Sequence, residues 1–242
     1  EGFEAALLHG FLAWDYLRLG ELDGAMVEVT RGYEIERFEE DRYGTTYGMN
    51  RFARYVAALA REFDGSQDGA EIDLNLLAED TGNHPAVLFS LQLVRALQTL
   101  EGARESRQKS TLVVVFERGT MPQKVEESVT FNTRRSIGQL ALPAFERRPG
   151  IGGTLRVNLG GTTVGNTVVL EDVEEVARRN LRDRIGWITT KAIARAAGKT
   201  ILIDAAAEAV EEEHGQLAGL AVGLFGSVLN LVSESADLRS WL

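Results

Sequence analysis

The chain has 242 residues, enough for one large domain or two modest ones, and its 44% hydrophobic and 26% charged residues are ordinary for a soluble globular protein. A net charge of −10 argues against nucleic acid as a partner, because phosphate binding needs a basic surface. Cysteine is absent, which excludes disulfides, thiolate catalysis and Cys-based metal sites without indicating a compartment.

The charge is unevenly distributed along the chain. Residues 1–101 hold 19 acidic and 8 basic side chains, whereas residues 102–242 hold 17 and 18. This change predicts two parts of different character, a helical domain over 1–108 and an α+β domain over 109–242. The chain opens on an apolar helical stretch with neither Met nor a signal sequence, so we expect a mature or trimmed fragment.

The first helical hairpin is predicted over residues 3–35. Apolar side chains follow a helical spacing over 3–19, and Gly20 ends that helix as a C′ glycine does. A second helix of roughly 14 residues follows. The spacing matches a tetratricopeptide repeat at Leu12, Ala13, Tyr16, Gly20, Leu22 and Ala25. Small Ala13 and Ala25 let the two helices approach each other closely.

A second, weaker copy of this hairpin follows. The stretch GELDGA at 20–25 returns as GSQDGA at 65–70, so Gly65 and Ala70 stand 45 residues after Gly20 and Ala25. Arg61 and Gln67 replace Tyr16 and Leu22, which weakens the match. A third helix is expected over roughly 86–107. An ordinary helical bundle with coincidental Gly–Ala echoes stays open as the alternative.

The second half is predicted to combine strands and helices. Strands are expected near 111–117, 124–131, 137–142, 154–159 and 164–170, which together favour an antiparallel sheet. Helices then follow over about 171–233, including long ones at 187–212 and 217–232. The fold class is therefore α+β: tetratricopeptide-like helical hairpins, then a small antiparallel sheet covered on one face by long helices.

The stretch 217–232 is apolar apart from Ser227 and Asn230, and it contains G-x-x-x-G at Gly219 and Gly223. A membrane span needs about 20 residues, so this run of 16 falls short. We expect a buried helix whose glycines pack closely against 187–212. The alternative is a helix that binds a membrane surface or a partner.

The sequence contains no motif that carries chemistry. The GKT at 198–200 lacks the preceding glycine and the strand of a phosphate loop, and the three histidines lack metal-ligand spacing. His214 follows three glutamates, which is typical of a solvated helix end. The sequence predicts no catalytic residue, no cofactor and no metal site.

Two motifs, FERGTMPQK at 116–124 and ADLRSW at 236–241, resemble an uncharacterised family of bacterial outer-membrane lipoproteins with tetratricopeptide-like N-terminal helices. The resemblance spans nearly all of the chain. It implies a periplasmic protein anchored by a lipidated N-terminal Cys that this chain lacks. The family implies no catalytic residues. Asp237, Arg239 and Trp241 match its terminal motif, and we expect them to pin the chain end as an Asp–Arg pair with a buried Trp.

We therefore expect a non-enzymatic scaffold in the cell envelope that binds envelope proteins, other lipoproteins among them, and meets the membrane only through the lipid anchor. The first helix of each tetratricopeptide unit lines the concave groove, so Trp14 and Tyr55 are candidate contact residues, with burial in the core as the alternative. The alternative function is an envelope-polymer hydrolase or transferase with its site at the sheet edge. A cleft with converging acids would favour that function.

Overall fold

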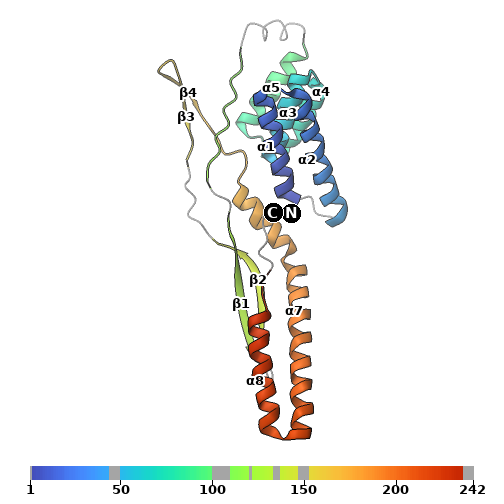
Figure 1. Ribbon diagram of the computed structural model, residues 1–242. Helices are drawn as coiled ribbons and strands as arrows, with labels where there is room; N and C mark the ends of the chain where they lie inside the picture. Colours follow the sequence, from blue (N-terminus) through green and yellow to red (C-terminus); the bar gives the residue numbers. More distant parts are fainter. Residues whose placement is uncertain are drawn as a thin grey trace. The chain divides into compact units, whose positions relative to one another are not determined.

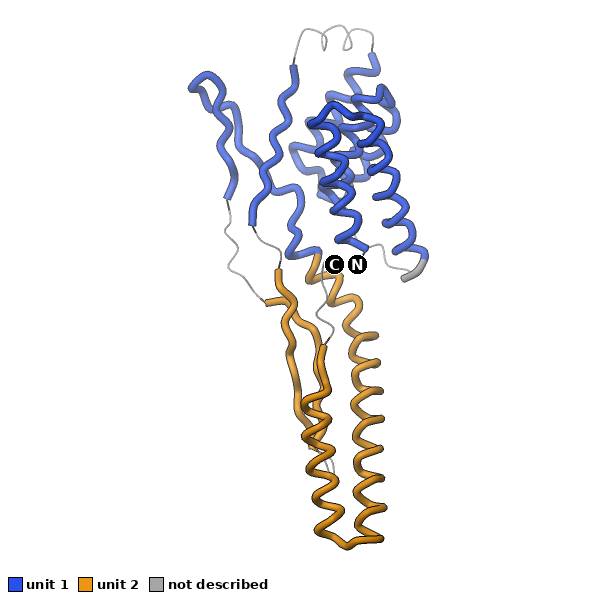
Figure 2. The backbone as a smooth tube through the Cα atoms, in the orientation of Figure 1, with its two compact units in different colours: residues 1–120, 150–176 blue, residues 121–149, 177–242 orange. Residues whose placement is uncertain are grey.

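The computed structural model describes residues 2–43, 50–99, 110–119, 122–132, 137–146 and 153–236, and every structural statement below concerns these. They form helices and two small antiparallel sheets, which confirms the predicted α+β class with helical hairpins at the N-terminus (Figure 1). The chain divides into two compact units (Figure 2). The first unit comprises residues 1–120 and 150–176, and the second comprises 121–149 and 177–242.

The first hairpin consists of α1 (Gly2–Leu19) and α2 (Leu22–Tyr43). Gly20 has a φ of 76°, a conformation that L side chains adopt only under strain. The turn closes α1 with two backbone bonds, from Gly20 N to Leu17 O at 3.1 Å and from Glu21 N to Tyr16 O at 2.9 Å. The helices meet at Ala13 and Ala25, both buried, as predicted.

The second hairpin repeats this geometry. It consists of α3 (Arg51–Asp64) and α4 (Gln67–Asp80), with Gly65 at a φ of 83°. Gly65 N donates to Glu62 O at 3.2 Å and Ser66 N donates to Arg61 O at 2.9 Å, the same two bonds 45 residues later. Ala70, the counterpart of Ala25, is also fully buried. The echo in the sequence therefore marks two equivalent helical turns.

The helix α5 (Pro85–Leu97) packs against α4 and begins at His84, whose Nδ1 accepts a hydrogen bond from Ala86 N at 3.3 Å. It ends ten residues earlier than the sequence predicts, and residues 100–109 lie outside the described part. Two apolar clusters hold the helices together. The first includes Leu7, Ala13, Ala25, Val29, Phe52 and Val56, and the second includes Ala70, Leu74, Leu77, Val87, Leu91 and Val94.

Residues 153–176 pack with the helical hairpins rather than with the second unit. They include β3 (Arg156–Leu159) and β4 (Thr162–Asn166), which pair only with each other. Leu170 packs against the second cluster, Val173 packs against the first, and Glu171 accepts a hydrogen bond from Arg51 N at 2.6 Å. The compact units thus differ from the expected ranges 1–108 and 109–242, which stay a prediction about folding domains.

The predicted single sheet is wrong in two respects. The described strands form two separate two-stranded sheets, and residues 110–118 are paired with neither. The β-rich segment that predicted a strand at 111–117 packs Val115 against the first helical cluster instead. Side-chain burial on helices, rather than pairing with a neighbouring strand, therefore decides where this segment lies.

The second unit contains β1 (Lys124–Asn132) paired antiparallel with β2 (Ile137–Phe145), and most of the helix α7 (Val173–His214) followed by α8 (Gln216–Ser233). One continuous α7 replaces the separate helices expected before and after residue 187, because Gly186 stays helical. The helix α8 covers β2, and Ile137 N donates to Ser227 Oγ at 2.9 Å.

The prediction that α8 is buried is wrong. Only 22% of its 18 residues are buried, although its mean hydropathy is 1.6. By length and composition it is the one helix in the described part of the chain that could cross a membrane. The glycines pack on α7 as expected, but they bring only the small-residue face of α8 inward.

Candidate functional site

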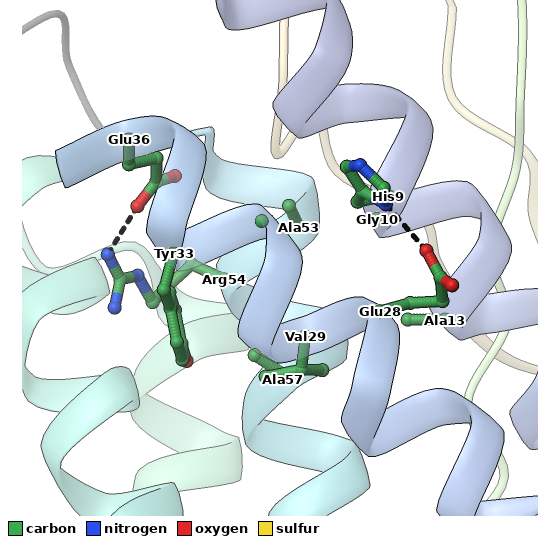
Figure 3. A pocket seen from close by; sticks show the side chains of 11 residues that line it. His9, Gly10, Ala13, Glu28, Val29, Tyr33, Glu36, Ala53, Arg54 and Ala57 are labelled. Atoms are coloured by element: carbon green, nitrogen blue, oxygen red, sulfur yellow. Dashed lines mark hydrogen bonds and ion pairs between the residues drawn. The ribbon is translucent and has the colours of Figure 1, made fainter. Parts of the chain in front are cut away.

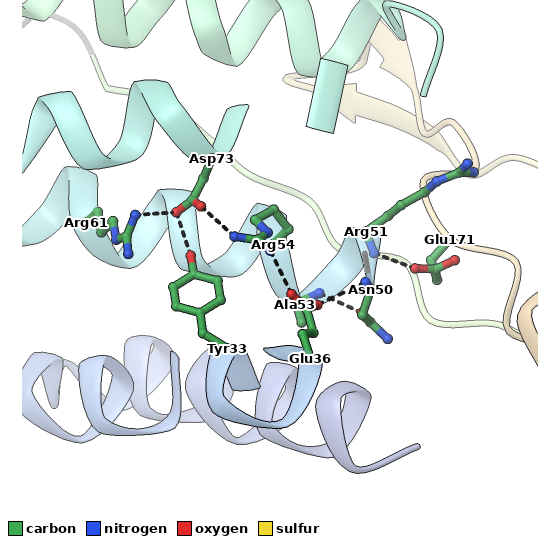
Figure 4. Close-up of polar contacts among 9 residues, drawn as sticks. All are labelled: Tyr33, Glu36, Asn50, Arg51, Ala53, Arg54, Arg61, Asp73 and Glu171. Carbon is green, nitrogen blue, oxygen red and sulfur yellow. Dashed lines mark hydrogen bonds and ion pairs between the residues drawn. The ribbon is translucent and has the colours of Figure 1, made fainter. Parts of the chain in front are cut away.

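The most developed polar site in the described residues is centred on Asp73, whose side chain is 1% exposed (Figure 4). Its carboxylate accepts hydrogen bonds from Tyr33 and Arg54 and forms an ion pair with Arg61. Tyr33 Oη lies 2.7 Å from Oδ2, Arg61 Nη1 lies 2.9 Å from Oδ2, and Arg54 Nη1 lies 3.1 Å from Oδ1. Residues from α2, α3 and α4 therefore meet at one carboxylate.

Arg54 extends this site to a second carboxylate. Its Nη2 donates to Glu36 Oε2 at 2.6 Å, and Glu36 Oε1 accepts from Asn50 N at 3.1 Å. Asn50 in turn caps α3, because its Oδ1 accepts from Ala53 N at 2.8 Å. We call Tyr33, Glu36, Arg54, Arg61 and Asp73 the buried ion network. It joins the middle of α2 to both ends of α3 and to the middle of α4.

Burial and charge act against each other in this network. Burial is the largest cause that raises the pKa of Tyr33 above its usual value, and the nearby Asp73 raises it further. Burial also raises the pKa of Glu36, because the attraction to Arg54 does not fully offset the loss of water. Burial opposes the charge of Arg54, but Glu36, Tyr33 and Asp73 outweigh it and raise its pKa.

The arrangement leaves little room for a reacting molecule. Arg54 and Arg61 both stack on the Tyr33 ring, with their guanidinium carbons 4.4 and 5.1 Å from its centre. Two arginines face two carboxylates, so the charges balance. The adjoining pocket, between α1, α2 and α3, holds about 10 Å³ of free space, at most one water molecule (Figure 3). The network is built to hold three helices together.

The first hairpin carries a simpler version of the same pair. His9 Nδ1 lies 2.5 Å from Glu28 Oε2, and both line the pocket in Figure 3. The two residues are 19 apart, as are Arg54 and Asp73, and each pair lies 45 residues from its counterpart. Each hairpin therefore places a basic side chain on its first helix against a buried acid on its second.

The sequence interpretation missed these four residues, although the signal was present. The repeat period that relates Gly20 to Gly65 also relates His9 to Arg54 and Glu28 to Asp73. The same period relates Tyr16 to Arg61, and the two side chains occupy equivalent places. A Cβ on Gly24 would lie 2.6 Å from the Tyr16 ring, and a Cβ on Gly69, its counterpart, would lie 3.0 Å from Arg61 Cδ. Arg61 therefore covers the same glycine and also reaches Asp73.

The two aromatic contact candidates are both half-buried. Trp14 packs against the first apolar cluster. Tyr55 packs against the second, its hydroxyl lies 3.0 Å from Ser90 Oγ, and burial raises its pKa. Their role in partner binding stays a prediction. Asp237, Arg239 and Trp241 lie outside the described residues.

No known protein-family model, curated protein or solved structure matches this chain. In the described part of the chain, no group of three His, Asp or Glu side chains is placed to hold a metal ion. The resemblance to outer-membrane lipoproteins therefore stays an expectation from the sequence.

The raised pKa of Glu36 gives a pH dependence of known sign. The folded state holds its proton more tightly than the unfolded chain, so the contribution to stability is present below the unfolded pKa of about 4.3. It is lost as the pH rises through the folded pKa. We expect the free energy of unfolding of wild type, measured relative to Glu36→Gln by urea denaturation, to increase as the pH falls from 7 to 4.

Glu71→Gln provides a control of opposite sign. Hydrogen bonds from Arg95 and then Gln98 lower the pKa of Glu71, so its contribution is present above the unfolded pKa and falls as the pH drops. Wild type should therefore lose stability relative to Glu71→Gln only as the pH falls below the unfolded pKa of about 4.3, so the measurements extend to pH 3. A constant difference between wild type and Glu36→Gln across the range would contradict the prediction.

Proposed function

We propose that this protein is a non-catalytic protein-binding module and that residues 110–118 form part of its binding surface. One observation carries the proposal: this β-rich segment has no strand partner among the described residues. Three large apolar side chains of the segment are exposed: Leu112 by 67%, Val114 by 38% and Phe116 by 43%. Val115, whose side chain points to the other side of the extended chain, packs against the first helical cluster. The segment has one face anchored and one apolar face open.

Such a segment is suited to strand addition by a partner. Side chains of an extended chain alternate in direction, so the anchored face fixes the segment while the backbone stays available for pairing. A partner strand would gain backbone hydrogen bonds, and its side chains would cover Leu112, Val114 and Phe116. An unpaired apolar segment of this kind is otherwise an aggregation hazard, which favours a partner in the cell.

The motifs at 116–124 and 236–241 support the cell envelope as the place of this partner, because they are the basis of the lipoprotein resemblance. The first motif overlaps the open segment over residues 116–118. The alternative, an envelope-polymer hydrolase or transferase at a sheet edge, gains no support from the described residues, where the acids of the buried network are paired with arginines.

The test is quantitative capture from an envelope extract. The full chain carrying Leu112→Ser and Phe116→Ser should recover its partners at least about tenfold less than wild type, because it loses the apolar part of the contact. Phe63→Ser with Phe89→Ser is the matched control, since these side chains are exposed by 70 and 59% on α3 and α5. Equal recovery by wild type and the segment variant would overturn the proposal.

A further inference from the structure

The two faces of α8 are the reverse of those of a helix on the surface of a soluble protein: its small and polar side chains face inward and its large apolar side chains face outward. Its buried positions are small or polar, namely Gly219, Gly223, Ser227 and Asn230. Seven of its ten exposed positions carry large apolar side chains. We define the outer stripe as Leu217, Leu220, Ala221, Leu224, Phe225, Val228, Leu229 and Val232. A surface helix normally presents its apolar stripe to the core instead.

The small face is held inward by close packing. A Cβ on Gly219 would lie 2.7 Å from Glu211 Cβ and 2.8 Å from Ala207 O on α7, and one on Gly226 would lie 2.6 Å from Ile203 Cγ2. Leucines do not fit in that space, so α8 cannot rotate to bury the outer stripe without moving away from α7. Figures 1 and 2 show the two helices side by side in the second unit.

The outer stripe is large enough for a stable interface. Seven of its side chains are between 53 and 86% exposed, from Leu229 to Leu217. At on the order of 100 Å² each they approach the roughly 800 Å² that each partner contributes to a standard protein interface. Few soluble monomers leave so large an apolar patch uncovered. No charged residue occurs between Gln216 and Ser233, so covering the stripe desolvates no charge.

The stripe is also symmetric under reversal of the helix direction. A two-fold axis between Leu224 and Phe225 would place these two opposite each other in the two copies. It would also place position 217 opposite 232, 220 opposite 229, and 221 opposite 228, so every stripe residue meets a stripe residue. Such a self-complementary patch is what a closed two-fold dimer requires.

Charge along α7 favours the same antiparallel arrangement. Lys199 lies 2.8 Å and Arg195 lies 3.5 Å from Glu234, level with the C-terminal end of α8. Glu212 and Glu213 lie next to the turn at the N-terminal end of α8. Antiparallel copies would bring the acidic end of one opposite the basic end of the other. Parallel copies would place like charges together at both ends.

We propose that the outer stripe of α8 binds the same stripe of a second copy of this chain, in antiparallel order. A lipid surface suits the stripe less well. The acidic end at Glu212 and Glu213 would be repelled by anionic headgroups, whereas interfacial helices are flanked by Lys and Arg. A bilayer span would also carry the neighbouring charges of α7, such as Lys199, into the hydrocarbon.

The oligomeric state of the full chain tests this proposal. Sedimentation equilibrium should give twice the chain mass of 26.5 kDa. Leu224→Glu should weaken the dimer by on the order of 100-fold or more, since two buried glutamates would meet near the axis. Leu202→Glu on α7 is the matched control, because Leu202 is 72% exposed outside the stripe. Circular dichroism should show unchanged helix content in both variants.

Cysteine cross-linking tests the direction of the helices, because the chain has no Cys of its own. A mixture of Leu217→Cys and Val232→Cys chains should form disulfide-linked dimers on oxidation, and neither variant alone should do so. Linked dimers from Leu217→Cys alone would overturn the antiparallel order. A monomer at all concentrations would overturn the interface itself, as would flotation of a monomer with anionic vesicles that Leu224→Glu abolishes. None of these substitutions alters residues 110–118, so the outcome is independent of the proposed function.

Discussion

Asp73→Asn should destabilise the protein by roughly 3–5 kcal/mol in urea denaturation, the largest effect we expect from a single polar substitution. Asp73 is 1% exposed, accepts hydrogen bonds from Tyr33 and Arg54, and forms an ion pair with Arg61. The amide removes the negative charge, so the half-buried Arg61 loses its ion-pair partner and Arg54 keeps only Glu36. An uncompensated charge away from water is far more costly than the pair is favourable.

Asp15→Asn is the control for this change. Asp15 pairs with Arg18 at 3.4 Å, and their side chains are 63 and 64% exposed, so water screens the pair. The expected loss is below about 1 kcal/mol. If Asp73→Asn cost no more than Asp15→Asn, the buried ion network would have no part in holding α2, α3 and α4 together.

Ala70→Leu should cost roughly 2–3 kcal/mol, because the added side chain has no space between α3 and α4. Ala70 is fully buried and lies among Ala58, Leu74 and Leu77 in the second cluster. Ala25→Leu should cost a similar amount, because Ala25 occupies the same place in the first hairpin. Thermal and urea denaturation would measure both changes.

Ala96→Leu on α5 is the matched control for overpacking, since Ala96 is exposed and its free energy of unfolding should change by about 0.5 kcal/mol or less. The comparison of Ala25→Leu with Ala70→Leu tests the repeat itself. A large cost at one position and none at the other would show that the two hairpins pack differently, despite their equivalent turns.

The second hairpin departs from the repeat pattern at Arg61 and Gln67, and Arg61 shows how one replacement can make two contacts. Arg61 stands where the repeat has Tyr16, and it covers Gly69 as Tyr16 covers Gly24. It also forms an ion pair with Asp73 and donates a hydrogen bond to Gly69 O at 3.1 Å. Gln67, in the place of Leu22, donates to Glu62 O at 3.3 Å near the end of α3. The departures from the pattern thus maintain the hairpin through polar contacts.

The helical part was largely predictable because its determinants are local. Turn glycines, small residues at helix contacts and apolar spacing act within one hairpin, and they predicted the turns at Gly20 and Gly65. The buried ion network was not predicted. Arg54 and Asp73 are ordinary charged residues in the sequence, and only the packing of α2, α3 and α4 against one another removes them from water.

By itself, the sequence determined the α+β class, the two helical hairpins with their period of 45, and the small and large faces of the helix at 217–232. The tertiary structure decided that the large apolar face of this helix stays exposed. Close approach to α7 admits only the glycine face of α8, so the apolar stripe stays exposed. It also decided that residues 110–118 pack on the helices without a partner strand, because the contact of Val115 with the first apolar cluster takes the place of strand pairing. Both outcomes depend on distances between segments far apart in the chain, which no local pattern encodes.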